Sequence, residues 1–223
     1  MVGEVGFKIL ECSNYDHIAS CASTLSDGGV IVFPTDTVYG IGCNPYYDEP
    51  VERIFHIKDR SEDKPLPIMG SNISDIEKIV HMSSLAKSLA QHFWPGALTI
   101  VSPCKDNNIS RRVMAGGDNL AVRIPGSTCT QTLLRFCKYL IGTSANVSGR
   151  KPCTSSFEVL SSGLSGFDLI LDGGILGGGI ESTIVEVIDS KVRILREGVI
   201  KSDKIYEVVS QVLNARPEIR NER

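Results

Sequence analysis

Short apolar runs alternate with helical patterns along most of this sequence, and this alternation restricts the fold more than any other feature. The runs at 30–33, 66–69, 97–101, 120–124, 140–143 and 168–171 have the length and composition of buried strands. Helical patterns lie at 48–58, from 74 onward, around 85–93, at 130–139, from 155 onward and at 202–213. Segments 183–188 and 192–195 read as a hairpin. The alternation predicts an α/β fold.

Several helices carry recognisable start signals and an apolar face. Asp48 is expected to cap one helix, with Pro50 in its first turn. Ser74 with Glu77, and Ser155 with Glu158, have the spacing of capping boxes. In the last helix Ile205, Val208, Val209, Val212 and Leu213 share one face, which should pack inward.

The length of 223 residues fits one domain, because no linker or repeat interrupts the pattern. An apolar share of 42% is enough for a substantial core at this length. We therefore predict a single domain over residues 1–215. Residues 216–223 are predicted to be a polar C-terminal tail.

The charge balance bears on nucleic-acid binding. A net charge of -3 is far from the basic character of a protein that wraps nucleic acid, and aromatic residues make up only 6%. Arg111–Arg112 and Arg150–Lys151 could still form a local basic rim. An RNA-binding module without catalysis is therefore kept as an alternative function, and strongly salt-dependent RNA affinity would favour it.

The cysteines indicate a reduced compartment. The sequence has seven of them, an odd number, and no two form a CxxC pair. This pattern predicts neither a disulfide framework nor a zinc site, and most of the thiols should be buried as small apolar groups. With no signal peptide and no long apolar run, a cytoplasmic protein without membrane contact is expected.

Two polar segments with possible chemistry follow the first strand and the first helix. Residues 34–40, Pro-Thr-Asp-Thr-Val-Tyr-Gly, place hydroxyls and a carboxylate where a buried strand ends, which is where α/β sheets bind ligands. An ordinary Asp/Thr turn would give the same pattern. Lys58, Arg60 and Lys64 either complement the dipole at a helix C-terminus or form a phosphate clamp.

Two further polar segments lie later in the chain. Residues 142–149 resemble a nucleophile elbow only loosely, because Asn146 stands where glycine is needed and no activating histidine is evident. Ser144 is better suited to hydrogen bonding with phosphate or ribose. The glycine-rich run 173–183 either admits an anion close to its backbone or is a flexible loop. Arg123 and Arg196 end two strands that could face the same cleft.

These segments together resemble the YrdC-like family of threonylcarbamoyl-adenylate synthases. The matching stretches are 28–40, 58–60, 94–96 (Trp-Pro-Gly), 121–125 (Ala-Val-Arg-Ile-Pro), 144–146 (Ser-Ala-Asn), 172–174, 181–183 (Glu-Ser-Thr) and 195–198 (Leu-Arg-Glu-Gly). They occur in family order and cover roughly residues 20–200. The ordered set is far more specific than any one segment.

The resemblance implies a single domain with a twisted mixed sheet, surrounded by helices, around a deep concave cavity. It implies that L-threonine and bicarbonate condense to N-carboxythreonine, which attacks the α-phosphate of ATP and releases pyrophosphate. Mg²⁺ is expected to accompany ATP, and no protein metal site is expected. The product should pass to a separate tRNA threonylcarbamoyl transferase, with transient tRNA contact as a further expectation.

The resemblance also assigns roles to individual residues. L-threonine should contact Thr37, Met69, Arg123, Gly142 and Ser182. ATP should contact Lys58, Arg60, Lys64, Asn119, Ser144, Asn146, Cys153 and Arg196, with Lys58 and Arg60 as the catalytic pair. Met69 stands where some relatives have histidine, and Cys153 where some have serine.

Two expectations concern relatives with additional domains. Some carry a further C-terminal domain, and this sequence is expected to be the stand-alone form. A carbamoyl-adenylate-forming enzyme of hydrogenase maturation contains a similar domain, but it also carries an acylphosphatase segment and paired CxxC zinc motifs. Neither occurs in these 223 residues, so this alternative is disfavoured.

Overall fold

The strands are divided between two mixed sheets in the structure, a computed structural model that describes residues 7–214. The first sheet has the order β1 (Lys8–Glu11), β9 (Leu169–Asp172), β2 (Ile31–Phe33), β3 (Gly40–Gly42) and β8 (Thr143–Ser144). The second has the order β11 (Lys191–Arg196), β10 (Thr183–Ile188), β5 (Leu98–Pro103), β6 (Asn119–Arg123), β4 (Ile68–Gly70) and β7 (Tyr139–Ile141). The predicted α/β class and mixed pairing are confirmed, with two sheets in place of one.

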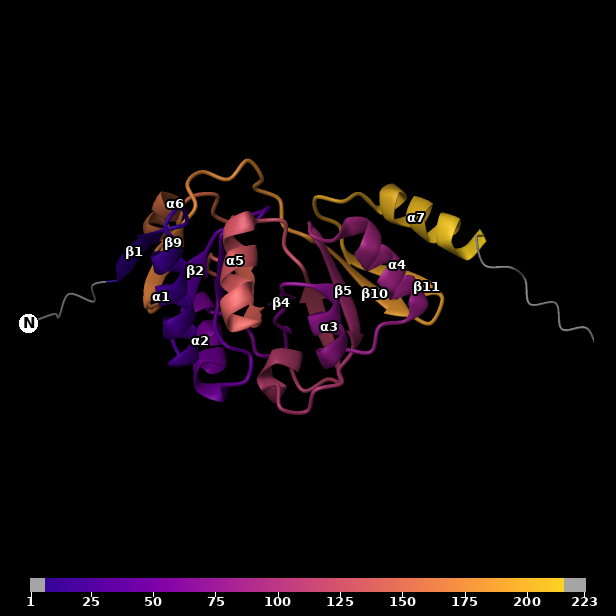
Figure 1. Ribbon diagram of the computed structural model, residues 1–223, viewed down its shortest axis with the longest axis horizontal. Helices are drawn as coiled ribbons and strands as arrows, with labels where there is room; N and C mark the ends of the chain where they lie inside the picture. The colour runs from indigo at the N-terminus through magenta and orange to yellow at the C-terminus, as the bar shows by residue number, and fades with distance from the viewer. Residues whose placement is uncertain (1–6, 215–223) are drawn as a thin grey trace, which may run out of the picture.

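Helices surround both sheets, and one of them lies between the two groups (Figure 1). Beside the first sheet are α1 (Tyr15–Ser26), α2 (Asp48–Lys58) and α6 (Ser156–Ser161). Beside the second are α3 (Ile73–Ile79), α4 (Ser84–Phe93) and α7 (Ser202–Asn214), with α4 and α7 in contact. In the middle, α5 (Thr128–Cys137) packs on α1 and also contacts β4 and β7.

Side-chain caps begin most of these helices, and they correct two expected start signals. The helix α3 is capped by Asn72, whose side chain accepts from the Asp75 amide, rather than by Ser74. Asp48 lies in the first turn of α2 and not at its cap position. The cap at Ser155 is confirmed, since its hydroxyl accepts from the Glu158 amide.

Four elements were not assigned from the sequence, and one of them is β3, which begins at the end of the polar segment 34–40. The strand β1 and the helix α1 precede the first predicted strand. The short 3-10 helix η1 (Arg111–Met114) lies inside the polar segment that we interpreted as a loop. As expected, the last helix buries Ile205, Val208 and Val209 against the core. The predicted tail at 216–223 lies outside the described residues.

The chain passes between the two sheets at positions that matter for the site. Gly142 is the single residue between β7 in the second sheet and β8 in the first. The glycine-rich segment 173–182 makes a second connection, from β9 to β10, and residues 43–67, which contain α2, make a third, from β3 to β4. The ends of β2 and β6 are joined across the same seam by side-chain contacts between Asp36 and Arg123. The polar segments therefore meet where the two sheets meet.

A disulfide joins Cys12, which follows β1, to Cys129 in the first turn of α5. The expectation of unpaired cysteines is wrong for this pair, so the cysteines no longer indicate a reduced compartment. Cys21, Cys43 and Cys153 are buried thiols as expected. The bond links residues 117 positions apart, so no local spacing in the sequence signals it.

We expect the Cys12→Ser/Cys129→Ser variant to be less stable than the native protein. Cross-linking residues so far apart removes much of the entropy of the unfolded chain, which corresponds to about 3–5 kcal/mol for a loop of this length. Urea unfolding of both proteins measures the difference. Cys21→Ser serves as the control for losing a buried thiol, and equal midpoints for native protein and double variant would contradict the prediction.

Each helix within residues 7–214 falls short of the length and apolar content that crossing a bilayer requires.

Candidate functional site

A cavity of about 790 Å³ opens at the seam between the two sheets, and all four polar segments contribute to its wall. Its volume lies in the range of about 300–1,000 Å³ that small-molecule sites occupy. The predicted site residues that line it are Thr37, Lys58, Arg60, Lys64, Met69, Arg123, Gly142, Ser144, Asn146, Ser182 and Arg196. Residues spread over 160 positions of sequence are thus brought together at one site.

Two predicted site residues are not part of this wall. Asn119 is exposed at the start of β6, whereas Arg123 at the other end of that strand lines the cavity. Cys153 is buried in the main core, and burial raises the pKa of its thiol. Its backbone carbonyl accepts from the amide of Tyr39, so Cys153 supports the segment 34–40 through its backbone.

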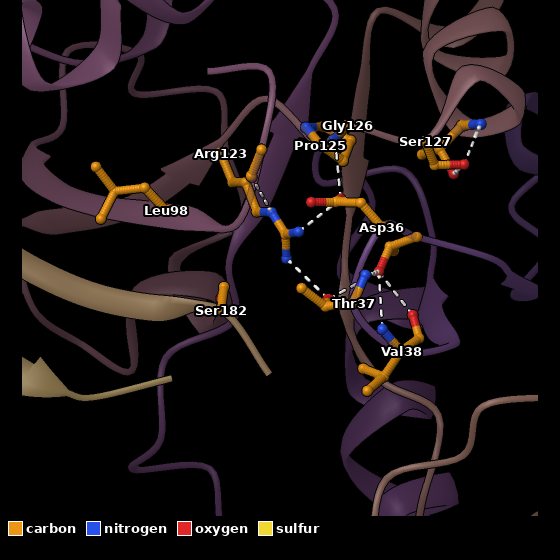
Figure 2. Close-up of polar contacts among 12 residues, drawn as sticks. Asp36, Thr37, Val38, Leu98, Arg123, Pro125, Gly126, Ser127 and Ser182 are labelled. Atoms are coloured by element: carbon orange, nitrogen blue, oxygen red, sulfur yellow. Dashed lines mark hydrogen bonds and ion pairs between the residues drawn. The ribbon is translucent and has the colours of Figure 1, made fainter. Parts of the chain in front are cut away.

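The segment after β2 forms a tight hydroxyl-bonded turn. Thr35 Oγ1 accepts from the amides of Thr37 and Val38 at 3.1 and 3.2 Å and donates to the Val38 carbonyl at 2.6 Å. The Thr35 and Thr37 hydroxyls are 2.9 Å apart. Both threonines are buried, so the turn presents the Thr37 hydroxyl at a fixed position in the cavity wall (Figure 2).

Arg123 lies opposite this turn and is only 4% exposed. Its Nε donates to the Gly96 carbonyl at 2.9 Å, Nη1 to Thr37 Oγ1 at 3.3 Å and Nη2 to Asp36 Oδ1 at 2.6 Å (Figure 2). Burial lowers the pKa of the Arg123 guanidinium, and the Asp36 carboxylate opposes that shift. The result is a fixed cation in the wall of the cavity.

A second group of polar contacts joins β5, β10 and β11. The hydroxyls of Thr99 and Ser182 are 2.9 Å apart, and Arg196 donates to the Ser182 carbonyl from Nε at 3.2 Å and from Nη2 at 3.0 Å. Arg196 Nη1 also pairs with Glu181 Oε2 at 2.8 Å. Arg196 is thereby directed along the cavity wall, next to the proposed threonine contact Ser182.

Lys58 differs from the simple phosphate clamp that the sequence suggested. The helix α2 ends at Lys58 because Asp59 adopts a left-handed conformation with φ 47°. The Lys58 side chain is buried, and its Nζ donates to the carbonyls of Ser144 and Asn146, the latter at 2.7 Å. An ammonium has three donors, so one remains for a ligand. Lys58 therefore shapes the 144–146 segment as well as lining the cavity.

Burial of Lys58 also changes its titration. Desolvation, together with the nearby Arg60 cation, lowers the pKa of the ammonium to about 8. Arg60 is partly exposed and donates from Nη2 to the Pro65 carbonyl at 2.9 Å. These contacts hold two cations side by side at the end of α2, a suitable arrangement for phosphate groups.

Two polar atoms near these cations have no partner in the part of the chain that the structure describes. Asn146 donates from Nδ2 to the carbonyls of Val147 and Arg150, which leaves Oδ1 buried and unbonded. The Ser148 hydroxyl is also buried and unbonded. Both residues line the cavity, and orphaned buried polar atoms of this kind are what a bound ligand or water satisfies.

Gly142 and Met69 touch one another at the base of the seam. A Cβ added at Gly142 would lie 2.5 Å from Met69 Cε and 2.7 Å from Met69 Sδ. A side chain at position 142 would therefore require the end of the Met69 side chain to move. The two predicted threonine contacts are placed together, with Met69 supplying an apolar surface.

Sequence reasoning missed several residues of the cavity wall, among them Thr99, Ser148 and Arg150. Thr99 could have been found, because it is a hydroxyl within the apolar strand β5 and is fully buried. Asp36 and Glu181 were quoted only within motifs, although each pairs with a predicted arginine. Ser148 carried no local signal beyond its place in the polar segment 142–149, and Arg150 was singled out only as part of a basic rim with Lys151.

The carboxylates of the wall bear on metal binding. Asp63 and Glu181 line the cavity, and residues 7–214 contain no group of three or more His, Cys, Asp or Glu side chains that could hold a metal ion. Mg²⁺ is commonly held by one or two carboxylates together with substrate phosphates and water. These residues fit an ion that arrives with a nucleotide, with Glu181 and Asp63 as the available protein ligands.

The fold and the wall together define a small-molecule site for anionic ligands in a two-sheet α/β domain. The family model Sua5_yciO_yrdC, described as "Telomere recombination", matches residues 23–198, so this chain belongs to that family. It is 37% identical over 203 residues to a threonylcarbamoyl-AMP synthase of Bacillus subtilis, covering 90% of this chain. It is 33% identical over 197 residues to one from Pyrococcus abyssi, covering 87% of this chain.

A solved structure of P. abyssi Sua5 complexed with L-threonine matches with a TM-score of 0.85 and 30% identity over 91% of this chain. The match covers 60% of that Sua5 chain. The chain likewise spans 58% of the length of each of the two synthases. The YrdC-like resemblance inferred from the motifs is confirmed.

Proposed function

We propose that this chain makes threonylcarbamoyl-AMP, pyrophosphate and water from L-threonine, bicarbonate and ATP. The observation that carries the proposal is the single cavity in which a hydroxyl- and arginine-lined end adjoins a cluster of cations. Support also comes from relatives that are named threonylcarbamoyl-AMP synthase and from the L-threonine complex of the similar Sua5. The product would pass to a separate tRNA threonylcarbamoyl transferase.

In this proposal L-threonine occupies the end of the cavity formed by Thr37, Arg123 and Ser182. The guanidinium of Arg123 takes the amino acid carboxylate, because a planar fork of donors matches two carboxylate oxygens. Met69, beside Gly142, contacts the threonine methyl group. Such a methyl contact contributes only about 1–3 kcal/mol to selectivity over serine.

The nucleotide occupies the other end. Four cations face its phosphates: Lys58, Arg60, Lys64 and Arg196. The rest of the nucleotide can contact Ser144 and the unbonded Oδ1 of Asn146. Bound Mg²⁺ would neutralise phosphate charge. The roles of Asn119 and Cys153 as direct nucleotide contacts are not part of the proposal, since neither lines the cavity.

The wall supplies alignment and charge, which is what the proposed reaction requires. An oxygen of the N-carboxy group of N-carboxythreonine forms the new bond to the α-phosphorus of ATP. The bond between the α-phosphorus and the oxygen that bridges to the β-phosphate breaks, and pyrophosphate leaves. The attacking carboxylate is already ionised, so this step needs no general base. Cations that neutralise charge on the leaving pyrophosphate, together with correct positioning, lower its barrier.

We expect ATP affinity to weaken as the pH rises above about 8. Burial holds the pKa of Lys58 near 8, so its ammonium, charged below that pH, is lost above it. Isothermal calorimetry between pH 7 and 9.5 measures the dependence, with Lys58→Ala as the matched control whose affinity should lack this slope. The same slope in native protein and variant would contradict the assignment of the titrating group to Lys58.

The decisive test incubates the protein with ATP, Mg²⁺, bicarbonate and L-threonine. Pyrophosphate release that depends on both threonine and bicarbonate, with threonylcarbamoyl-AMP detected by mass spectrometry, is the expected result. Folded protein that binds neither ATP nor threonine would overturn the proposal and favour the RNA-binding alternative.

Against the RNA-binding alternative, Arg112 is paired with Glu52 and Glu62, and Arg111 lies 3.9 Å from Asp118. We propose the cytoplasm as the site of action, where ATP and tRNA are available.

A further inference from the structure

The donors of Arg123 are divided between the protein and the cavity. A guanidinium carries five N–H groups. Three of them are taken by Gly96, Thr37 and Asp36, which leaves one on each terminal nitrogen. Arg123 lines the cavity, so this remaining pair is available to the two oxygens of a carboxylate. Rotation of the guanidinium would change which N–H groups are free to bind a ligand carboxylate.

Asp36 is the group that opposes such a rotation most strongly. Its Oδ1 accepts from Arg123 Nη2 at 2.6 Å and from the Gly126 amide at 2.9 Å. Figure 2 shows the carboxylate between the guanidinium and the backbone that enters α5. The carboxylate is therefore held from two sides, by a side chain of the second sheet and by the segment before α5.

The chain around Gly126 is shaped for this carboxylate. A Cβ added at Gly126 would lie 3.3 Å from Asp36 Cβ, Cγ and Oδ2, so a larger residue would press on the Asp36 side chain. Ser127, the next residue, caps α5. The side chain of Asp36 is 21% exposed. Its carboxylate pairs with the buried Arg123, which would otherwise be a costly isolated charge.

We propose that Asp36 is a positioning residue for the amino acid substrate, because it fixes the rotation of Arg123 and so presents one N–H from each terminal nitrogen to the threonine carboxylate. This inference rests on the proposed function. Asp36 acts through Arg123 rather than on the reacting atoms. Its removal should therefore weaken threonine binding and leave the nucleotide end of the cavity unchanged.

The test is a steady-state comparison of Asp36→Ala and Asp36→Asn with the native protein. In Asp36→Ala we expect the KM for threonine to rise about 10- to 100-fold, the effect of losing a hydrogen bond to a charged group, with the KM for ATP unchanged. Asp36→Asn keeps an acceptor oxygen for Arg123 and Gly126, so it should recover part of the threonine affinity.

Asp168→Ala is the matched control, because it also removes an aspartate that pairs with an arginine between two elements. Asp168 pairs with Arg53 at 2.8 Å, and neither residue lines the cavity. We expect this variant to lose thermal stability without a change in the KM for threonine. A rise in that KM equal to the rise in Asp36→Ala would mean that Asp36 acts only through general stability, and would overturn the proposal.

The outcomes separate this inference from the proposed function. If the native protein makes threonylcarbamoyl-AMP but both Asp36 variants keep its KM for threonine, the positioning role is wrong and the proposed function stands. If native protein neither turns over nor binds threonine by calorimetry, the proposed function itself fails. Should Asp36→Ala not fold, a KM for threonine in Asp36→Asn equal to that of the native protein would overturn the role.

Discussion

Replacing Lys58 with alanine is expected to lower pyrophosphate release by about 10²–10³-fold, the effect of removing one fixed electrostatic donor from an active site. The structure adds a second consequence. The carbonyls of Ser144 and Asn146 lose the ammonium that bonds them, so the segment that carries both predicted nucleotide contacts loses its support. Initial rates with saturating threonine and bicarbonate, together with ATP binding by calorimetry, measure both effects.

Two further variants make the Lys58 result interpretable. Arg60→Ala should also lower the rate, but with less loss of thermal stability, because Arg60 is partly exposed and its hydrogen bonds are to the nearby Lys64 and Pro65 carbonyls. Lys151→Ala removes one positive charge from an exposed position that does not line the cavity, and should behave as the native protein. Native rates in folded Lys58→Ala and Arg60→Ala would rule out the phosphate-binding assignment.

Gly178→Ala is expected to lower kcat/KM for threonine by about 10²-fold. A Cβ at this position would lie less than 3.0 Å from the Thr37 carbonyl oxygen, and a backbone atom has little freedom to move away. The same oxygen accepts from the Gly179 amide at 3.0 Å, so the segment 173–182 and the turn at Thr37 would have to separate. Misplacement of a substrate contact by about 1 Å can cost a factor of this size.

Gly177→Ala is the control for this prediction. It changes the neighbouring residue in the same way, but a Cβ at Gly177 meets nothing within 4 Å. We expect it to retain native kcat/KM. Steady-state kinetics with varied threonine compare the two variants, and equal effects would show that loop flexibility, rather than contact with Thr37, makes the glycine necessary.

The sequence predicted those features of the fold that depend on residues close together in the chain. The apolar periodicity of residues 202–213 and the hairpin at 183–195 each depend on neighbouring residues, and both are confirmed. The division into two sheets depends on pairing between distant strands, such as β4 with β6 and β7, which periodicity does not specify. The Cys12–Cys129 bond escaped prediction for the same reason.

The site shows the same difference between local and distant information. The family motifs, which occur here in the same order as in the family, identified the segments that meet in the cavity. The types of their residues indicated an anionic ligand. The separate roles of the cavity residues could be assigned only from the structure. It shows that the buried Lys58 donates to two backbone carbonyls as well as lining the cavity. Likewise, Asp36 could be quoted in a motif, but its contact with Arg123 spans 87 positions.

The seam between the sheets also has a thermodynamic consequence. Each end of the cavity combines residues from both sides of the seam: Thr37 follows β2 and faces Arg123 at the end of β6, and Lys58 ends α2 beside the first sheet whereas Arg196 ends β11 in the second. A ligand in the cavity therefore binds only when both sheets are folded and adjacent, and its binding free energy adds to the cooperativity of unfolding. Neither side of the seam keeps a complete site on its own, so separation of the two sheets would abolish binding and remove the stability that the ligand contributes.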